Sequence, residues 1–443
     1  MSPTELRASL GLAGIFALRM LGMFILLPVF AVYATHLQGG ENHAAVGMAL
    51  GAYGLTQALL QLPFGMWSDR VGRKTVMYVG LALFALGSFF AAASDSIAMV
   101  TLGRALQGSG AISAAITALL ADLTREEHRT KAMAMIGMTI GITFSGSLAL
   151  GPWLAHQLGV NGIFALTGVL ALVAMLVVRF IVPNPPVSHF HSDAEANPAQ
   201  LREVLRHGQL RRLNFGIFAL HAAQMAMFVV MPWVLIHTGQ LPPAQHWHVY
   251  LPAVCIGFVV MIPAIIYGEK RAQLKPVLIG AITLMVLAQL GLVRGYQDFR
   301  AVVALLILYF IAFNILEASL PSLVSKIAPP ASKGTAMGVY NTFQSLGLFT
   351  GAAVGGWAAA QFGRDAVFFG AGVLMFAWLM LAIGMPSPPA VKTKLFHLPE
   401  GVAAETLRDR LLAVKGVYEL AVLPAEQAIY LKVAQQGWDE ATT

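Results

Sequence analysis

The sequence Gly65-Met-Trp-Ser-Asp-Arg-Val-Gly-Arg-Lys74 interrupts a long apolar part of the chain with one carboxylate, three cations and two glycines. It is flanked by Ala45–Met66 and Thr75–Ala93, and each of these runs is long enough to cross a bilayer as a helix. Charged side chains are costly inside the hydrocarbon core, so this group belongs at its boundary. We therefore predict a tight turn between two membrane helices at a water interface.

The composition of the whole chain agrees with a membrane protein. Of its 443 residues, 57% are hydrophobic and 11% are charged, whereas about 25% of the residues of a soluble protein are charged. The net charge of +7 comes from cations that gather in alternate loops, which indicates membrane topology and argues against a nucleic-acid-binding surface. The single cysteine, Cys255, excludes an intramolecular disulfide and a thiolate metal site.

Twelve apolar segments follow one another, which predicts an all-α polytopic membrane protein with twelve transmembrane helices. The first segment is too long for the apolar region of a cleaved signal peptide, so we expect it to remain as a helix. Most loop cations fall on the side of residues 69–74, and the positive-inside rule places this side, and both termini, in the cytoplasm. The segments are 11–33, 45–66, 75–94, 97–120, 132–153, 162–182, 213–236, 248–268, 276–294, 300–324, 334–359 and 366–385.

The second half of the chain repeats the first at an offset of about 200 residues. Gly14-Ile-Phe-Ala-Leu-Arg19 returns as Gly216-Ile-Phe-Ala-Leu-His221, and Trp67-Ser-Asp-Arg70 returns as Tyr267-Gly-Glu-Lys270. Pro, Trp and Gly positions share this offset, so chance similarity between apolar helices does not account for it. The repeat predicts two pseudo-symmetric six-helix bundles, over residues 1–182 and 213–385, related by an axis along the membrane normal.

The polar stretch resembles a motif of the major facilitator superfamily, G-x-x-x-D-R-x-G-R-K, between the second and third helices. The resemblance implies that Asp69 caps the eleventh helix near Lys333-Gly334 and that Arg73 pairs with Asp122, as contacts that hold the outward-facing state. A plain positive-inside loop would explain the cations, but not the acid or the glycine spacing. The residues of this gating motif are Gly65, Asp69, Arg70, Gly72, Arg73, Lys74 and Asp122.

Two further stretches resemble motifs of the same superfamily. Leu102-Gly-Arg104-Ala-Leu-Gln-Gly108 would place an arginine inside the first bundle, where it marks a functional group or a structural salt bridge. The fifth helix carries small residues at spacings of four and then a proline, a pattern typical of drug:proton antiporters. Ordinary close packing of helices is the alternative interpretation. The antiporter-motif residues are Gly137, Gly141, Gly151 and Pro152, with Ser145 and Gly146 between them.

Three ionisable groups occur at one depth of the predicted membrane segments. Arg19, His221 and Glu317 each lie roughly 13 Å from the cytoplasmic helix end, at 1.5 Å per residue. Arg19 and His221 are repeat equivalents, so we expect them to face each other across the central axis. Simple packing is the alternative for a lone histidine, but three such groups favour a proton-coupling and substrate cavity. Further polar candidates for this cavity are Arg104, Gln57, Gln61, Gln107, Gln224, Asn314, Asn341 and Gln344.

The polar segments outside the bundles predict linkers and one small domain. We expect residues 183–212 to form a cytoplasmic linker. Its His189-x-His191-x-Asp193 motif is interpreted as part of a solvated segment rather than a metal site. The stretch Leu201–Leu213 predicts a basic amphipathic helix on the membrane surface. After a proline-rich linker at 386–394, residues 395–443 predict strand 394–398, helix 403–412, strands 417–423 and 428–433 and the intervening turn 424–427. This β-α-β-β order is most of a ferredoxin-like cytoplasmic domain. Its last helix and strand would be missing, as expected of a chain that is cut short.

These features predict a secondary active transporter that works by alternating access. The antiporter resemblance favours proton-coupled export of a small organic molecule by a monomer in a bacterial inner membrane, with uptake or uniport as alternatives. A membrane sensor with a ligand-binding C-terminal domain is the other hypothesis. No phosphate-binding G-x-x-x-x-G-K-[ST], H-E-x-x-H or G-x-S-x-G motif occurs, so we expect no enzymatic activity and no cofactor or metal. The sequence does not identify the substrate.

Overall fold

The computed structural model describes residues 1–184, 197–329, 332–387, 391–397, 411, 414, 416–423, 428–434 and 438. Its first half is helical because long apolar runs can satisfy their backbone hydrogen bonds only within a helix when water is absent. Gly72, with φ of 96°, supplies the predicted turn, which lies between α3 and α4. The elements are α1 Pro3–Phe24, α2 Phe30–Tyr33, η1 Ala34–His36, α3 His43–Val71, α4 Arg73–Ala92, α5 Ile97–Ser109, α6 Ser113–Asp122 and α7 Glu126–Phe180.

The second half of the chain follows the same plan. Prolines occur inside α9, α10 and α12, where neighbouring helices can compensate for the missing backbone donor. The elements are α8 Pro198–Arg206, α9 Gly208–His237, η2 Pro243–Gln245, α10 Trp247–Lys270, α11 Leu274–Gly295, α12 Phe299–Ile327, α13 Lys333–Phe362 and α14 Arg364–Ile383.

Together these helices confirm the predicted all-α polytopic fold. Among the described residues, nine helices are long and apolar enough to cross a membrane. One of them, α7, is 55 residues long and turns at Gly159, whose φ is 68°, so it accounts for two crossings. The pair α5 and α6 and the 30-residue α13 supply the remaining two. They are not among the nine because α5 and α6 are each too short and α13 is less apolar.

Two of the predicted segments are not continuous helices. Segment 11–33 is interrupted because α1 ends at Phe24 and α2 begins only at Phe30, with Pro28 in the turn between them. Segment 97–120 is divided into α5 and α6 around Gly110. A side chain at Gly110 would collide with the backbone oxygen of Gly80 in α4, so the break occurs where two backbones approach closely.

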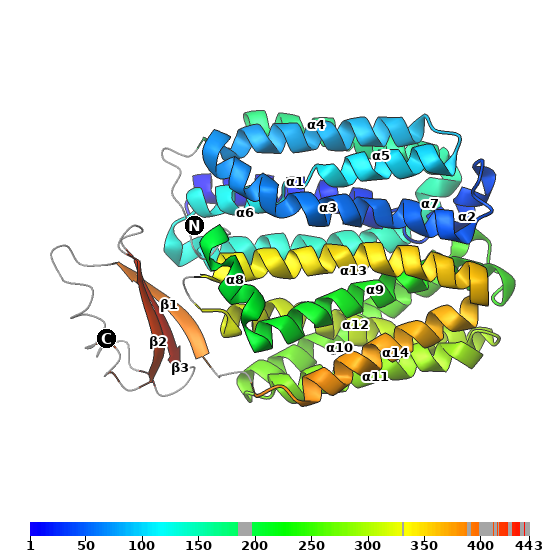
Figure 1. Cartoon of the computed structure of the whole chain (residues 1–443). Coiled ribbons are helices and arrows are strands. Elements are labelled where there is room, and N and C mark those ends of the chain that lie inside the picture. Colours follow the sequence, from blue (N-terminus) through cyan, green and yellow to red (C-terminus); the bar gives the residue numbers. More distant parts are fainter. Residues whose placement is uncertain are drawn as a thin grey trace.

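The helices run side by side, with the first half on one side and the second half on the other (Figure 1). The most extensive contact between the halves joins α3 to α13. Gly47 and Gly51 of α3 pack against the backbone oxygens of Ala352 and Phe349, and Gly356 of α13 packs against that of His43. These contacts need glycine because any β-carbon would clash, which is how helices approach closely in lipid.

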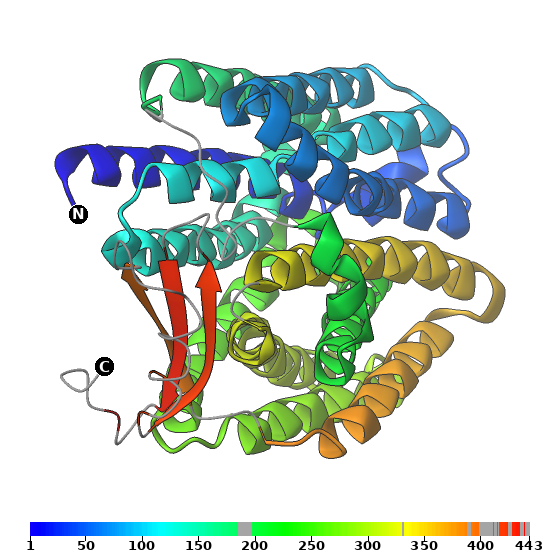
Figure 2. The same ribbon diagram turned by 60° about the vertical axis from the view of Figure 1, so that its left-hand side comes forward.

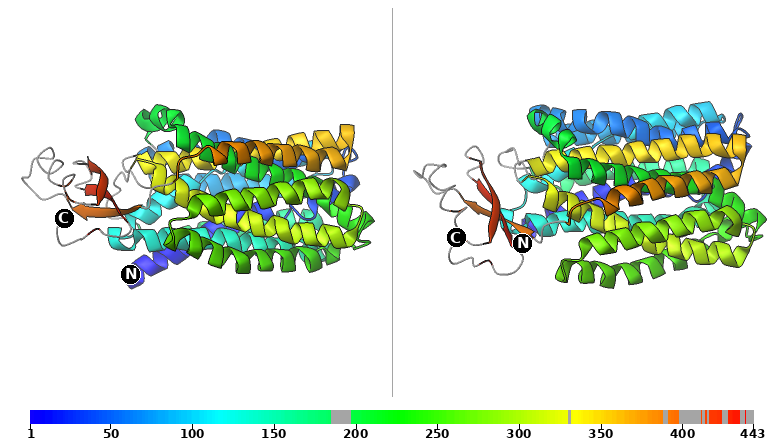
Figure 3. Two further views of the ribbon diagram at one scale, coloured as in Figure 1. Left: turned by 90° about the horizontal axis from the view of Figure 1, so that it is seen from below. Right: turned by 60° about the horizontal axis from the view of Figure 1, so that its bottom comes forward.

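A three-stranded antiparallel sheet lies at one end of the helices, which we call the sheet end, and Met1 lies at the same end (Figures 1 and 3). Its strands are β1 Val391–His397, β2 Val417–Leu423 and β3 Ala428–Ala434, in the order β1-β3-β2. The three strands are close to those predicted, and the sheet is consistent with a ferredoxin-like domain. The predicted helix 403–412, apart from Leu411, and the turn 424–427 lie outside the described residues.

The linker contains a helix that packs differently from our prediction. The amphipathic stretch expected over residues 201–213 is divided at His207, and α8 packs against the first turns of α13. The Asn197 backbone N–H donates to Thr335 Oγ1 over 2.9 Å, and the Thr335 hydroxyl donates to Gln200 Oε1 over 3.3 Å. Figure 2 shows α8 crossing the sheet end of the helices beside α13. Residues 185–196, including His189, His191 and Asp193, lie outside the described residues.

Candidate functional site

The gating motif forms an ion-pair cluster at the sheet end of the first half. Arg73, the first residue of α4, has only 4% of its side chain exposed and pairs with Asp69 at the end of α3. Its Nε also lies 3.6 Å from Asp122 Oδ2 at the end of α6, and its Nη1 donates to Ser68 Oγ over 2.9 Å. The predicted pairing of Arg73 with Asp122 is therefore present, and it joins the ends of three helices.

The remaining motif residues have separate surroundings. A β-carbon at Gly65 would lie 3.1 Å from Ala114 Cβ, so Gly65 is where α3 approaches α6. Lys74 Nζ donates to the Val182 carbonyl over 2.6 Å, while Arg70 is exposed. Asp69 forms an ion pair with Arg73. The capping of α13 by Asp69 stays a prediction.

A second ion-pair cluster occupies the corresponding place in the second half. Glu269, near the end of α10, pairs with Lys326 of α12 and accepts a hydrogen bond from Ser322 Oγ over 3.0 Å. Glu269 is the repeat equivalent of Asp69, so the acid is retained while the cation comes from a different helix. Our sequence predictions did not include this cluster, although the repeat of Trp67–Arg70 in Tyr267–Lys270 was the signal that could have indicated it.

Arg104 belongs to a polar network inside the first half. Its side chain is 1% exposed, and its Nη1 donates to Gln107 Oε1 over 2.9 Å and to the Gly22 carbonyl over 3.4 Å. The guanidinium also lies 4.9 Å from the centre of the Tyr53 ring, and Gln107 donates to Ser88 Oγ over 2.7 Å. These contacts all stay within the first half, so the structure does not bring Arg104 to the groups predicted in the second half.

Arg19 is also buried, and only part of its guanidinium is bonded. Nη1 donates to Ser113 Oγ of α6 over 2.5 Å, while Nε and Nη2 have no hydrogen-bond partner among the described residues. The described contacts therefore do not show Arg19 facing His221 as expected. Burying charged N–H donors without partners is expensive, so this site is suited to a ligand that supplies acceptor atoms.

Three predicted cavity residues of the second half form one cluster. His221 Nε2 on α9 lies 2.9 Å from Gln344 Nε2 on α13 and 3.7 Å from Glu317 Oε2 on α12. Gln344 Nε2 also donates to Glu317 Oε1 over 3.4 Å. His221 Nδ1 lies 3.3 Å from the Ile217 carbonyl, so a neutral imidazole can donate from Nδ1 and accept from Gln344 at Nε2. Three helices thus hold one carboxyl and one imidazole in direct contact.

The cluster lies beside an accessible space. A quarter of the Glu317 side chain is exposed, while that of His221 is 3% exposed. Gln344 and the predicted Asn341, which precedes it on the same helix, are both partly exposed. Glu317 Oε2 itself is buried and accepts no hydrogen bond from the described residues. A proton or a bound molecule can therefore take this position without displacing a protein donor.

The antiporter-motif residues of α7 do not act as one smooth contact face. A β-carbon at Gly141 would lie 3.3 Å from the Phe258 ring of α10, and one at Gly151 would lie 2.6 Å from the Ile25 carbonyl. No such neighbour lies within 4 Å of Gly137 among the described residues. Pro152 lies inside α7, directly after the close approach at Gly151. Only part of the motif is therefore explained by helix packing.

Comparison with known proteins gives a consistent assignment. The sequence profile of the Major Facilitator Superfamily matches residues 12–350 and 213–423. The chain is 44% identical to the inner membrane transport protein YajR of Escherichia coli (strain K12), over 98% of this chain and 95% of that protein. It is 26% identical to the multidrug resistance protein MdtH of Aeromonas salmonicida (strain A449), over 76% and 84% of the two chains.

A solved structure shares the fold. A bacterial homolog of the human lysosomal transporter Spinster, in an inward-facing and occupied conformation, superimposes with a TM-score of 0.69 at 15% identity, over 86% of this chain and 97% of that one. The two matches of the family profile, the high identity to YajR and the two sets of helices agree with one another. The chain is a multi-pass membrane transporter rather than an enzyme, and it belongs to the Major Facilitator Superfamily.

Proposed function

We propose that this transporter exports a small organic molecule in exchange for protons, by alternating access, as a monomer in a bacterial inner membrane with its sheet end in the cytoplasm. The observation that supports this most directly is the contact of His221, Glu317 and Gln344 on three different helices. A carboxyl group that can hold either a proton or a substrate is a simple antiport device, because the two then compete for one position.

The geometry suggests how the proton is held. In the neutral arrangement, Gln344 donates to both His221 and Glu317, and Glu317 Oε2 is free to carry a proton. When His221 instead takes the proton at Nε2, its 3.7 Å separation from Glu317 Oε2 becomes that of an ion pair. A change in the exposure of Glu317 as the two halves move would then couple proton release to substrate binding.

Arg19 suggests the chemistry of the substrate. Its unsatisfied Nε and Nη2 donors favour a molecule with carbonyl, carboxylate or other oxygen acceptors. Such a molecule would contact Arg19 in the first half and Glu317 in the second. The substrate would therefore lie between the two halves, as alternating access requires.

The names of relatives also favour export. One similar protein is the multidrug resistance protein MdtH, and another, 27% identical over 60% of this chain, is the class E tetracycline resistance protein of Escherichia coli. The ion pairs Arg73–Asp122 and Glu269–Lys326 at the sheet end would act as gate contacts that form and break during the cycle.

Purified protein in liposomes provides the test. An imposed proton gradient should drive accumulation of an accepted substrate by the native chain, and Glu317→Gln should abolish this while still permitting exchange of substrate down its own gradient. Glu41→Gln, at an exposed site before α3, is the matched control and should leave both activities unchanged. Proton-driven accumulation by Glu317→Gln would place coupling elsewhere, and substrate movement in the same direction as protons would replace export by uptake.

A further inference from the structure

A cavity of about 380 Å³ opens among the helix ends that are remote from the sheet. Its floor and walls come from the ends of α9 and α13, the turn after α11 and the start of α14. His43 at the start of α3 closes it from the other half of the chain. The volume falls in the range typical of small-molecule sites, about 300–1,000 Å³. The cavity lies away from the cluster around Glu317, and its residues play no part in the proposed coupling.

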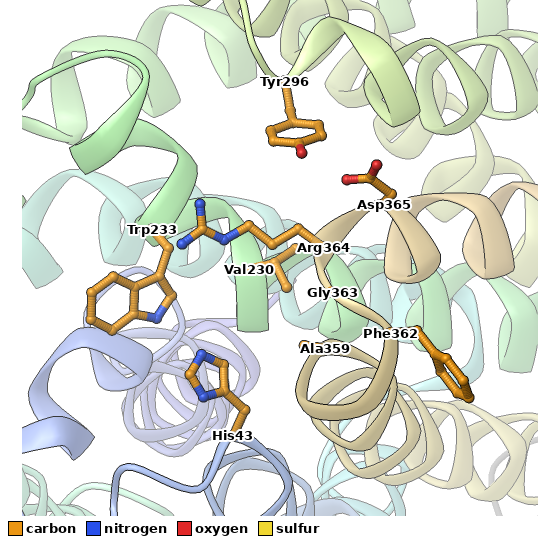
Figure 4. Close-up of a pocket in the computed structure, with 9 residues that line it drawn as sticks. All are labelled: His43, Val230, Trp233, Tyr296, Ala359, Phe362, Gly363, Arg364 and Asp365. Carbon is orange, nitrogen blue, oxygen red and sulfur yellow. The ribbon is translucent and has the colours of Figure 1, made fainter.

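Opposite charges point into this cavity from adjacent positions of the chain. Figure 4 shows the guanidinium of Arg364 reaching across toward Trp233, the carboxylate of Asp365 on the other side, and the Tyr296 hydroxyl directed between them. None of these side-chain groups has a hydrogen bond or ion pair with another residue in the described part of the chain. One cation, one anion and one hydroxyl are therefore available to a ligand.

A flat aromatic wall stands beside these charges. The Trp233 indole lies nearly parallel to two imidazoles: its ring centre is 6.4 Å from that of His43, at an interplanar angle of 24°, and 5.8 Å from that of His237, at an angle of 12°. This stack begins on α3 and ends on α9, so it crosses from one half of the transporter to the other. A planar apolar group would stack on the same surface.

We propose that this cavity binds a small zwitterion with a carboxylate, an ammonium group and a planar apolar body, of which an aromatic amino acid is the simplest example. The carboxylate would pair with Arg364, which can bind it through two parallel hydrogen bonds, and the ammonium would pair with Asp365. The ring would lie against Trp233 and Tyr296. An anion alone would leave Asp365 unpaired and a cation alone would leave Arg364 unpaired, so each should bind less tightly.

The position of His43 gives the ligand a consequence for transport. Because His43 belongs to the first half and the other named residues belong to the second, a bound molecule would join the two halves at the end remote from the sheet. It would oppose any motion that separates α3 from α13 there. The cavity is therefore a site from which a molecule on the remote side of the membrane can slow the transporter.

Isothermal titration of the full chain in nanodiscs with L-phenylalanine tests the proposal. Binding should be saturable and should weaken by about tenfold or more in Arg364→Gln and in Asp365→Asn, since each variant loses a charge-assisted hydrogen bond to the ligand. 3-Phenylpropionate lacks the amine and phenethylamine lacks the carboxylate, so both should bind less tightly than phenylalanine.

Matched variants distinguish binding in this cavity from binding elsewhere on the protein. Arg294→Gln removes an exposed cation at the same end that does not line the cavity, so this variant should bind L-phenylalanine as the native chain does. Glu317→Gln should also bind normally, and this distinguishes the cavity from the proposed coupling site. Four outcomes would each overturn the proposal. They are no binding of L-phenylalanine by the native chain, an equal loss of affinity in Arg294→Gln and Arg364→Gln, tighter binding of 3-phenylpropionate than of phenylalanine, and loss of phenylalanine binding in Glu317→Gln. If Arg364→Gln fails to fold, Asp365→Asn together with the two analogues decides the question.

Discussion

His221 Nε2 lies 3.7 Å from Glu317 Oε2, so an imidazole on α9 meets a carboxyl on α12 within the helices of the second half. Gln344 from α13 contacts both side chains. The amide can donate to either partner but cannot accept or release a proton under ordinary conditions. It therefore fixes the geometry of the pair, and the proton has two places at which it can reside.

The first prediction concerns His221. His221→Ala removes one of the two proton positions but leaves Glu317, so proton-driven transport should persist with a displaced pH optimum. Gln344→Ala preserves both titratable groups but removes the amide that holds them in place, and it should lower the rate at every pH. Initial rates in liposomes across a series of pH values measure both effects. An unchanged pH profile for His221→Ala would show that the histidine is only a packing residue.

The second prediction concerns the gate at Arg73. Arg73→Gln removes the buried cation that lies beside Asp69 and Asp122, and removing one partner of a buried ion pair costs about 3–5 kcal/mol. The conformation that contains this cluster should lose population, so a cysteine placed at Asn341 should react with a thiol reagent at a different rate. The background for all such variants is Cys255→Ser, since Cys255 is exposed. Arg70→Gln, at an exposed position in the same turn, is the control and should leave the labelling rate unchanged.

The third prediction concerns the second cluster. Glu269 and Lys326 are partly exposed, with side-chain accessibilities of 32% and 14%, so their pair should contribute less than the buried cluster around Arg73, on the order of 1 kcal/mol. Glu269→Lys and Lys326→Glu should each reduce transport because they place like charges together. The double variant restores an opposite pair and should recover most of the rate. Additive loss in the double variant would contradict a direct role for the pair.

The fourth prediction concerns the C-terminal sheet. Leu411, Ile429, Leu431 and Val433 form a small core of their own, separate from the core of the helices. A chain that ends at Met385 should therefore insert, remain folded and retain substrate-dependent proton flux in liposomes. Circular dichroism and size-exclusion chromatography verify folding before the flux is measured. Loss of flux from a folded truncated chain would assign the sheet a part in transport itself.

The fifth prediction concerns the contact between α3 and α13. Gly51 packs against the Phe349 backbone, where a β-carbon would lie 2.9 Å from the carbonyl oxygen. Gly51→Leu should force the two helices apart at the remote end and lower the population of the state described here. Gly280→Leu is a control, because nothing in the described part of the chain lies within 4 Å of a β-carbon at that position. Labelling of a cysteine at His43 should increase in Gly51→Leu and remain at the native level in Gly280→Leu.

The membrane class, the twelve crossings and the two-fold repeat could all be predicted from the sequence. The length of an apolar run and the charge of a loop are properties of short segments. In a bilayer such a run must form a helix, and the cations that flank it must lie outside the hydrocarbon core. The same local logic identified the turn at Gly72 and the three C-terminal strands. It also indicated Glu317 and His221, because an ionisable residue inside an apolar run is visible without any knowledge of its neighbours.

Which of these residues contact one another could not be predicted, because it depends on how the helices pack. Arg19 and Arg104 were expected near the groups of the second half, but their described hydrogen bonds go to Ser113, Gln107 and Gly22 of the first half. The place of a residue along its helix determines its depth in the membrane. The neighbours of its side chain depend on how the helix is rotated and tilted, and helix packing determines both. The break at Gly110 and the cavity beside Arg364 have the same origin, since each depends on a close approach between segments far apart in the chain.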